Sequence, residues 1–294
     1  MRIVVPFGAG GIADLTARAV GEALAQRLHQ PVVVDNRPGA GGVVAGETVA
    51  RSDPDGTTQL LVSNATAVSA GLFKRLPFDA QKDFAPVSLI GVFDLAVVVP
   101  AASPLRSIGD LLQAAKARPG NLNIASINAG STQNLAAELF KTTAGIDAQV
   151  VPFNGTPAVI TALRGGQVDA AVEILGPLRP QIEAGAVRAL AVMGEKRNAR
   201  LAGVPTLAET GGALAKFTVA SWNGLAAPAK TPATIVQRLA DEVAAAVGTP
   251  EVQRELAQLD VEPRHSTPAQ LAALLASETR RWGDVIARAG IPRQ

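Results

Sequence analysis

The chain has 294 residues, of which 48% are hydrophobic, and its Lys and Arg outnumber its Asp and Glu by 27 to 25. This composition is that of a folded globular protein with one large domain or two lobes, and it excludes a disordered chain. A net charge of +2 and an aromatic content of 3% argue against a nucleic-acid-binding surface. Because cysteine is absent, disulfides, thiolate nucleophiles and cysteine-based metal sites are excluded.

The sequence shows no sign of membrane insertion, because no apolar stretch reaches the roughly 18 to 20 residues that cross a bilayer. An apolar strand follows directly after Met1 and Arg2, which leaves no room for a secretory signal. We therefore expect either a cytoplasmic protein or an exported one whose signal has been removed.

Short β-rich runs alternate with helical patterns in the first part of the chain. Strands are predicted at residues 2–6, 31–35 and 59–62, and helices at 13–28 and 43–51. Strands separated by helices indicate βαβ units, a parallel sheet and right-handed crossovers. The apolar run 87–99, ended by Pro100, predicts one or two strands that leave the first lobe.

A second α/β series follows, and the chain then crosses back. Helices are predicted at 108–117, 133–144, 158–164 and 178–184, and strands at 123–125, 149–151, 170–174, 189–192 and 217–227. The helices 232–247, 251–259 and 268–289 complete the chain. We expect an α/β protein of two lobes, each a doubly wound, mostly parallel sheet flanked by helices. Lobe I would comprise residues 1–99 and 224–294 and lobe II residues 100–223, with a two-stranded hinge and the ligand in the cleft between the lobes.

Two segments, residues 3–14 and 122–132, share one pattern: an apolar strand, a loop of small residues and the start of a helix. A helix N-terminus leaves backbone N–H groups unpaired and has partial positive charge, so each loop is suited to a carboxylate or a phosphate. Two such loops in two halves of one chain predict a ligand that is held from both sides.

A dinucleotide site is the main alternative. Gly8 to Ala13 matches G-x-G-x-x-G/A, and Asp35 ends the next strand, where a ribose-binding acid is expected. Two features argue against an NAD(P)-dependent oxidoreductase. Pro6 and Phe7 lengthen the turn between the strand and the first glycine, and the second half of the chain offers no acid–base residues for hydride transfer. A ligand-sensing module is a third hypothesis, although no helix-turn-helix stretch precedes Arg2.

The resemblance to a known family covers essentially the whole chain. Residues 5–14 (VPFGAGGIAD) and 31–42 (PVVVDNRPGAGG) resemble the opening of the tripartite tricarboxylate transporter receptors, also called the Bug family of periplasmic solute-binding proteins. The similarity continues at residues 82–88 (KDFAPVS), 151–155 (VPFNG), 165–169 (GGQVD), 204–209 (VPTLAE) and 222–228 (WNGLAAP). These matches run in order, which is far more specific than any single glycine loop.

The resemblance implies a monomeric, non-catalytic flytrap receptor in the periplasm, with its signal removed. It would capture a small carboxylate and present it to membrane permease subunits, without a cofactor or metal. Main-chain amides and bridging water hold the ligand carboxylate in this family. Transferred to this sequence, the family's ligand contacts are Phe7, Gly8, Ala9 and Gly10 on one side, and Asn128, Gly130, Ser131 and Thr132 on the other.

Further candidates lie near these loops. Ser63 and Thr66, at the end of the third strand, can add hydroxyls. Asn154 replaces the lysine common in the family, Glu173 replaces an aspartate, and the first loop lacks the usual proline. Apolar neighbours surround Glu173, so its carboxylate needs a partner such as a ligand hydroxyl, an amino group or water.

The remaining notable side chains have structural interpretations. Phe7, Phe153 and Trp222 either line the cleft or belong to the core. We interpret His29 and His265 as surface residues, since neither forms a metal or catalytic motif.

Three polar side chains near strand and helix ends are expected to bond the backbone. Ser131 is not in a G-x-S-x-G elbow and is expected to cap a helix. Asp14 is expected to cap or brace the first helix, and Asp169 to bond backbone at a strand start.

Overall fold

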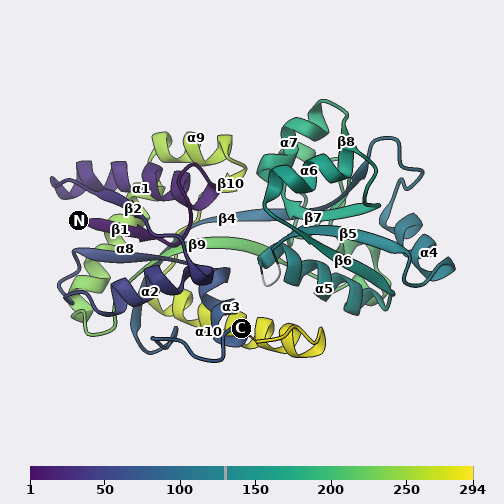
Figure 1. The fold of residues 1–294 in the computed structure, drawn as a ribbon. Coiled ribbons are helices and arrows are strands. Elements are labelled where there is room, and N and C mark those ends of the chain that lie inside the picture. The colour runs from purple at the N-terminus through teal and green to yellow at the C-terminus, as the bar shows by residue number, and fades with distance from the viewer. Residues whose placement is uncertain (129–130, 294) are drawn as a thin grey trace. The chain divides into compact units, whose positions relative to one another are not determined.

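The computed structural model describes residues 1–128 and 131–293. The chain forms two compact units (Figure 1). Unit 1 consists of Met1–Val92, Trp222–Ala287 and Ile291–Gln294, and unit 2 of Phe93–Ser221 and Arg288–Gly290. The chain therefore passes from unit 1 to unit 2 within one long strand, β4 (Phe84–Pro100), and returns within another, β9 (Ala220–Pro228).

The sheet of unit 1 has β1 in its middle. Its first three strands are β1 (Arg2–Val5), β2 (Val33–Asn36) and β3 (Thr58–Ser63). β1 pairs in parallel with both β2 and β3, and β9 runs antiparallel beside β3. The helices α1 (Ile12–Leu28) and α2 (Val43–Ala50) lie on opposite faces of this sheet (Figure 1). This is the doubly wound arrangement that the alternating pattern predicts.

A helix that the sequence analysis did not predict follows β3 without a loop. This helix, α3 (Asn64–Leu72), begins directly after Ser63, which forms a capping box with Thr66. Its sequence, NATAVSAGL, consists mostly of small residues, so it shows no wide apolar stripe of helical period. The capping box, and not an apolar stripe, marks the start of this helix in the sequence.

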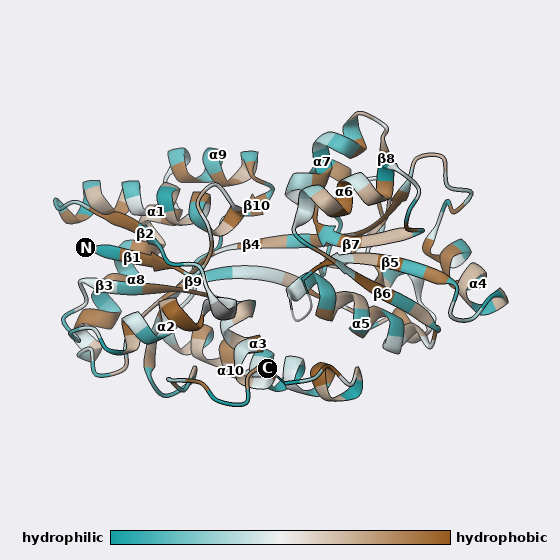
Figure 2. Cartoon of the chain, in the orientation of Figure 1, coloured by the Kyte–Doolittle hydropathy of each residue, from teal (hydrophilic) through white to brown (hydrophobic). Residues whose placement is uncertain are grey.

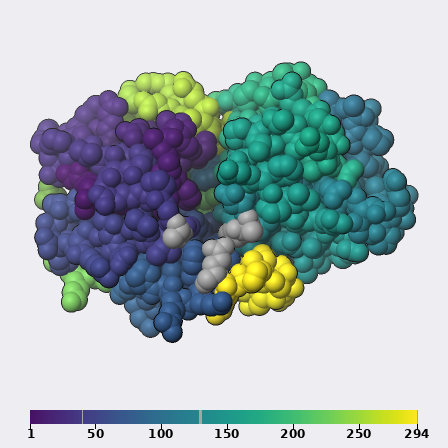
Figure 3. Space-filling view, in the orientation of Figure 1, coloured from purple at the N-terminus to yellow at the C-terminus, as the bar shows by residue number. Residues whose placement is uncertain are grey.

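The last part of the chain covers unit 1 with helices. They are α8 (Ala233–Val247), α9 (Pro250–Gln258) and α10 (Pro268–Arg288), with the short strand β10 (Val261–Glu262) between the last two. α1 packs against α8 and α9, and the space-filling view shows α1 (purple) and α9 (yellow-green) on the surface of unit 1 (Figure 3). β10 pairs with β4. A Cβ at Gly91 would lie 2.5 Å from Val261 Cγ1, so this glycine makes room for β10.

Unit 2 has a sheet of similar topology. Its strands, besides part of β4, are β5 (Leu122–Ile127), β6 (Ala148–Phe153), β7 (Ala170–Ile174) and β8 (Val187–Val192). Its helices are α4 (Ile108–Ala117), α5 (Thr132–Ala144), α6 (Thr156–Arg164) and α7 (Leu175–Glu183). β5 is parallel to β6 and β7, while β4 runs antiparallel to β7 and β8. α4 and β7 have the bounds that the sequence predicts. Short 3₁₀ turns occur at Ala40–Gly42, Ala199–Leu201, Ala208–Thr210 and Gly212–Leu214.

The two sheets share one strand arrangement without an evident sequence repeat. In unit 1 the order is β2-β1-β3 followed by the antiparallel β9, and in unit 2 it is β6-β5-β7 followed by the antiparallel β4. Apolar residues concentrate in the strands (Figure 2). The core of unit 2 includes the fully buried Val98, Leu163 and Ala171. In the described part of the chain, no helix combines the length and apolar character needed to cross a membrane.

Candidate functional site

The two candidate loops occupy equivalent positions in the two sheets. The first loop, residues 6–11, connects β1 to α1, and the second loop, residues 128–131, connects β5 to α5. β1 and β5 are each the middle strand of three parallel strands. Ligands of open α/β sheets bind beyond the carboxyl ends of such strands. Each unit therefore has one edge suited to a ligand.

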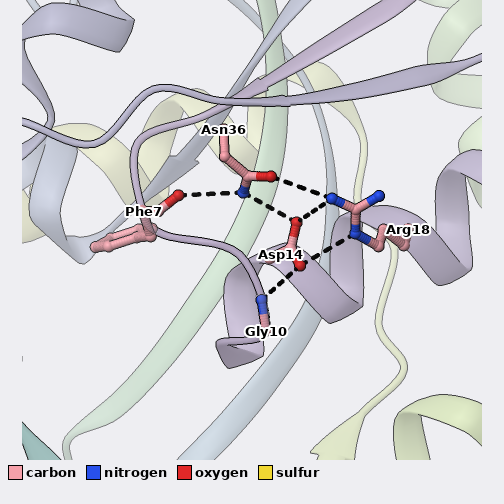
Figure 4. A network of polar contacts seen from close by, with 5 residues as sticks. All are labelled: Phe7, Gly10, Asp14, Arg18 and Asn36. Atoms are coloured by element: carbon pink, nitrogen blue, oxygen red, sulfur yellow. Dashed lines mark hydrogen bonds and ion pairs between the residues drawn. The ribbon is translucent and has the colours of Figure 1, made fainter.

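Asp14 and Asn36 hold the first loop in place, and Arg18 contacts both of them (Figure 4). Asp14, in the first turn of α1, is 1% exposed and its Oδ2 accepts the N–H of Gly10 at 2.8 Å. Asn36, at the end of β2, donates from Nδ2 to the carbonyl oxygen of Phe7 at 3.1 Å and to Asp14 Oδ1 at 2.9 Å. The loop is thus tied at Phe7 and at Gly10. The sequence predicts that Asp14 caps or braces α1; in the structure it braces the loop that precedes this helix.

Arg18 balances the charge of Asp14. Its Nε donates to Asp14 Oδ2 at 3.1 Å, its Nη2 lies 3.0 Å from Oδ1, and Nη2 also donates to Asn36 Oδ1 at 3.1 Å. Burial acts to raise the pKa of Asp14, but hydrogen bonds from Arg18, Gly10 and Asn36 outweigh it and hold the pKa below its usual value. Asp14 is therefore ionised at neutral pH and is neutralised by a neighbour on its own helix.

The first loop presents backbone donors that the protein does not use. Residues 7–11 are exposed. Across the described ranges, the amides of Gly8, Ala9 and Gly11 donate no hydrogen bond, whereas the amide of Gly10 is taken by Asp14. Gly10 has a φ of 83°, a left-handed conformation that favours glycine. Unpaired amides before a helix N-terminus are suited to an anion.

Ser63 and Thr66 lie at the same edge of unit 1, at the end of β3. Ser63 Oγ accepts the N–H of Ala65 at 3.2 Å, and Thr66 Oγ1 accepts the N–H of Ser63 at 3.2 Å. Both hydroxyl oxygens thus cap α3. Thr66 also lines a cavity of about 10 Å³ together with Pro6 and Phe78, a volume suited to a single water molecule.

The second loop is held by its own backbone and by a capping serine. The N–H of Asn128 donates to the carbonyl oxygen of Phe153 at 2.9 Å. Ser131 Oγ donates to the carbonyl oxygen of Ile127 at 2.7 Å and accepts the N–H of Asn134 at 3.1 Å. Thr132 is the first residue of α5, so the prediction that Ser131 caps this helix is confirmed. Gly130, also a predicted contact, lies outside the described residues.

The predicted contacts after β6 differ in exposure. Phe153 is half-buried and packs against the core of unit 2, whereas Asn154 is exposed. Of the other aromatic candidates, Phe7 is 37% exposed and Trp222 is 3% exposed. Phe7 is therefore the aromatic ring that is open to a ligand in the first loop, and Trp222 belongs to the core.

Glu173, near the end of β7, is fully buried. Its Oε1 accepts two hydrogen bonds, from Gln133 Nε2 at 2.7 Å and from the N–H of Ile174 at 2.8 Å. Its Oε2 has no hydrogen-bond partner in the part of the chain that the structure describes. Burial raises the pKa of Glu173, although the hydrogen bonds from Gln133 and Ile174, and to a smaller extent the hydroxyl group of Thr156, act in the opposite direction.

The sequence analysis missed Gln133 and Asn36 as parts of the two sites. Gln133 lies in the first turn of α5, 40 residues before its partner Glu173, and nothing in that spacing reveals their contact. Asn36 could have been identified from the sequence, because it directly follows a predicted parallel strand, at the edge of the sheet where ligands bind.

The residues considered for catalysis have structural roles. His29 and His265 are exposed, as predicted. Asp169 accepts the N–H of Asn123 at 2.8 Å, which confirms its expected backbone role. No group of His, Asp and Glu among the described residues is arranged to hold a metal ion.

Asp35, the acid of the dinucleotide hypothesis, is already paired. It forms ion pairs with Arg37 at 2.9 Å and Arg2 at 3.7 Å. A ribose hydroxyl at this carboxylate would have to compete with both guanidinium groups.

The sequence matches known proteins over nearly its whole length. A sequence profile of the family described as "Tripartite tricarboxylate transporter family receptor" matches residues 16–291. A Pseudomonas sp. (strain P51) protein, described as a UPF0065 protein in the tcbD-tcbE intergenic region, is 38% identical over 283 residues, which are 96% of this chain and 84% of the relative.

Solved structures of similar proteins share the fold. An R. palustris protein solved with adipate has a TM-score of 0.86 at 33% identity, covering 100% of this chain and 98% of the other. MatC from Rhodopseudomonas palustris, with bound malate, has a TM-score of 0.82 at 31% identity, with coverages of 97% and 98%. The periplasmic binding protein BugD has a TM-score of 0.83 at 29% identity, with coverages of 100% and 98%. These similarities confirm the predicted α/β binding-protein fold.

Proposed function

Because this chain belongs to the family of tripartite tricarboxylate transporter receptors, we propose that it binds a small carboxylic acid in the periplasm and delivers it, unchanged, to a membrane permease. The observation that carries the proposal is the full-length similarity to two proteins solved with the dicarboxylic acids malate and adipate. The same similarity leaves the oxidoreductase alternative without support, and the pairing of Asp35 with two arginines adds to that argument.

The proposal assigns ligand contacts to the loop of each unit. The free amides of Gly8, Ala9 and Gly11 in unit 1 are donors for one carboxylate, and their braced conformation lowers the entropy lost on binding. The full proposed contact set is Phe7, Gly8, Ala9, Gly10, Ser63, Thr66, Asn128, Gly130, Ser131, Thr132, Phe153, Asn154 and Glu173. Since one chain supplies all of these groups, the proposed receptor works as a monomer. It needs no metal or cofactor and performs no chemistry on its ligand.

A panel of acids tests this proposal. Acetate, succinate, malate, adipate, citrate, aspartate and benzoate would each be titrated calorimetrically into the protein, with NAD and NADP in parallel. An acid at 100 times its Kd stabilises the fold by roughly 2.7 kcal/mol, so a thermal-shift screen detects the same binding independently. We expect one class of acids to bind and to be recovered unchanged by NMR. Binding of a dinucleotide without any acid, or conversion of a bound acid, would contradict the proposal.

A further inference from the structure

The hydrogen-bond pattern at Glu173 is that of a neutral carboxylic acid. A neutral acid has one carbonyl oxygen, which accepts up to two hydrogen bonds, and one O–H donor. Oε1 accepts two N–H groups, from Gln133 and Ile174, and Oε2 accepts none. In a fully buried ionised carboxylate, a bare oxygen carrying half the charge is costly. A proton on Oε2 removes that cost and leaves a donor without an acceptor.

The charged residues around Glu173 do not compensate a negative charge there. β5 has no charged side chain, and the charged residues of the other elements packed against β7 bond elsewhere or lie at a far end. On β4, Asp94 accepts a hydrogen bond from Asn198. Glu138 and Lys141 of α5 pair with each other at 2.8 Å, and Arg179 and Glu183 of α7 pair at 3.1 Å. Arg164 lies at the end of α6. No charge–charge contribution to the pKa of Glu173 arises from any of them, and burial dominates.

We propose, on the basis of the function proposed above, that Glu173 binds the ligand as a neutral acid, donating a hydrogen bond from Oε2–H to a carboxylate oxygen, so that the receptor takes up an acid anion and keeps a proton beside it. An ionised Glu173 would repel an anionic ligand, whereas the O–H group attracts it. The sequence alone suggested the reverse, a ligand donor facing a glutamate acceptor. Oε1 is occupied, so the ligand meets Oε2.

The proposal predicts that affinity depends on pH with a definite sign. Where Glu173 is protonated in the free receptor, the acid binds without proton exchange. Above the pKa of Glu173 in the free receptor, each binding event must take up a proton, so the apparent affinity falls about tenfold for each pH unit. Simple carboxylic acids titrate near pH 4, so the ligand itself stays ionised from about pH 6 to pH 9. His29 and His265 are exposed, whereas Glu173 is fully buried, so neither histidine contacts it.

Calorimetry from pH 6 to pH 9 on the wild type and two variants tests this. Glu173→Gln keeps an oxygen that accepts from Gln133 and Ile174 and replaces O–H by a permanent N–H donor. We expect it to bind the best acid of the panel with no fall in affinity at high pH, whereas the wild type weakens at each pH where its free Glu173 is ionised. Glu183→Gln makes the same chemical change at an exposed, ion-paired position on α7 and should behave like the wild type. Carbon-13 NMR of glutamate carboxyl groups, with the Glu173 signal assigned by its loss in Glu173→Gln, reports protonation with and without the acid.

The outcomes separate this inference from the proposed function. A neutral Glu173 in the bound receptor, with wild-type affinity that falls only at pH values where the free Glu173 is ionised, supports the inference. Tight acid binding with Glu173 ionised in the complex, or affinity that does not fall at a pH where NMR shows free Glu173 to be ionised, overturns the inference and leaves the proposed function standing. If no acid of the panel binds the wild type at any of these pH values, both are overturned. The pH series on the wild type needs no variant, so a misfolded Glu173→Gln does not prevent the test.

Discussion

Asp14 Oδ2 accepts the N–H of Gly10 at 2.8 Å, so the first turn of α1 fixes the conformation of the loop that leads into it. The same carboxylate accepts from Asn36, which in turn binds the carbonyl oxygen of Phe7. Two ends of the first loop are thereby joined through one buried carboxylate. The free amides of this loop are held ready for an anion, and the negative charge that holds them is neutralised by Arg18.

Replacing Asp14 by Asn tests this arrangement. Asp14→Asn keeps the size of the side chain but removes the charge and one of the acceptor oxygens. We expect a loss of about 1–3 kcal/mol in the free energy of unfolding, because buried donors lose a charged partner. Acid affinity should fall as well, since the amides lose their fixed positions. Both tryptophans, Trp222 and Trp282, lie in unit 1, so urea unfolding followed by tryptophan fluorescence reports on this unit.

A matched control is Asp53→Asn, which makes the same chemical change at an exposed position in unit 1. It should leave both the unfolding curve and the acid affinity unchanged. Equal effects of the two substitutions would show that net charge, and not the contact with Gly10, determines the result.

The stability that Asp14 contributes should depend on pH. Its pKa in the folded protein is below its usual value, because hydrogen bonds from Arg18, Gly10 and Asn36 outweigh the opposing effect of burial. The contribution is therefore complete above the unfolded-state pKa of about 3.9 and is lost as the pH falls through the folded-state pKa. The difference in unfolding free energy between the wild type and Asp14→Asn should stay constant from pH 7 to about pH 5 and shrink below that. A difference that grows on acidification would show that burial raises this pKa overall.

Two glycines of the first loop provide a matched pair. Gly10 has a φ of 83°, whereas Gly8 has no left-handed φ, and a Cβ at either residue meets nothing within 4 Å. Gly10→Ala should therefore cost about 1 kcal/mol or somewhat more through backbone strain alone. Gly8→Ala should change stability by less than about 0.5 kcal/mol. Fluorescence-detected urea unfolding measures both, and equal costs would contradict the strain argument.

Much of the fold follows from patterns that operate over short stretches. The βαβ alternation predicts the parallel strands and their flanking helices, because period and turn chemistry are local properties. α3 was not predicted because residues 64–72 have no wide apolar stripe, and the start of this helix depends on the pairing of Ser63 with Thr66. Within α1, the apolar side chains of Leu15 and Ala23 are only half-buried. Asp14, in contrast, is buried in this helix because Arg18 and Asn36 compensate its charge.

The candidate site is less predictable because its contacts join distant residues. The bond from Asn36 to Asp14 spans 22 positions, and that from Gln133 to Glu173 spans 40. The sequence indicates which loops follow the middle strands, since glycine and small residues mark them. The side chains that hold those loops become identifiable only once the strand order places their ends together.

Ser131 should stabilise α5 through its hydroxyl. Ser131→Ala removes both the cap on the N–H of Asn134 and the bond to the carbonyl oxygen of Ile127. The loss of an N-cap typically costs about 1 kcal/mol. Hydrogen exchange of the amides in the first turns of α5 should accelerate accordingly. Ser277→Ala, at an exposed serine whose hydroxyl bonds only the preceding turn of α10, is the control and should leave α5 unchanged.

Gln133 should set the pH range over which Glu173 titrates. Its Nε2 donates to Glu173 Oε1 at 2.7 Å, a bond that favours the charged form and so lowers the pKa against the larger effect of burial. Gln133→Met keeps the length of this buried side chain but removes the donor. The pKa of Glu173 should therefore rise further, and the pH at which acid affinity begins to fall should move upward. Carbon-13 NMR of the Glu173 carboxyl group measures the first effect and calorimetry the second. The control, Gln149→Met, removes a donor to Gly120 on the exposed side of β6 and should alter neither. If the pKa of Glu173 fell in Gln133→Met, Gln133 would stabilise the neutral acid. Glu173 Oε1 would then not be the acceptor of the Gln133 bond in both protonation states.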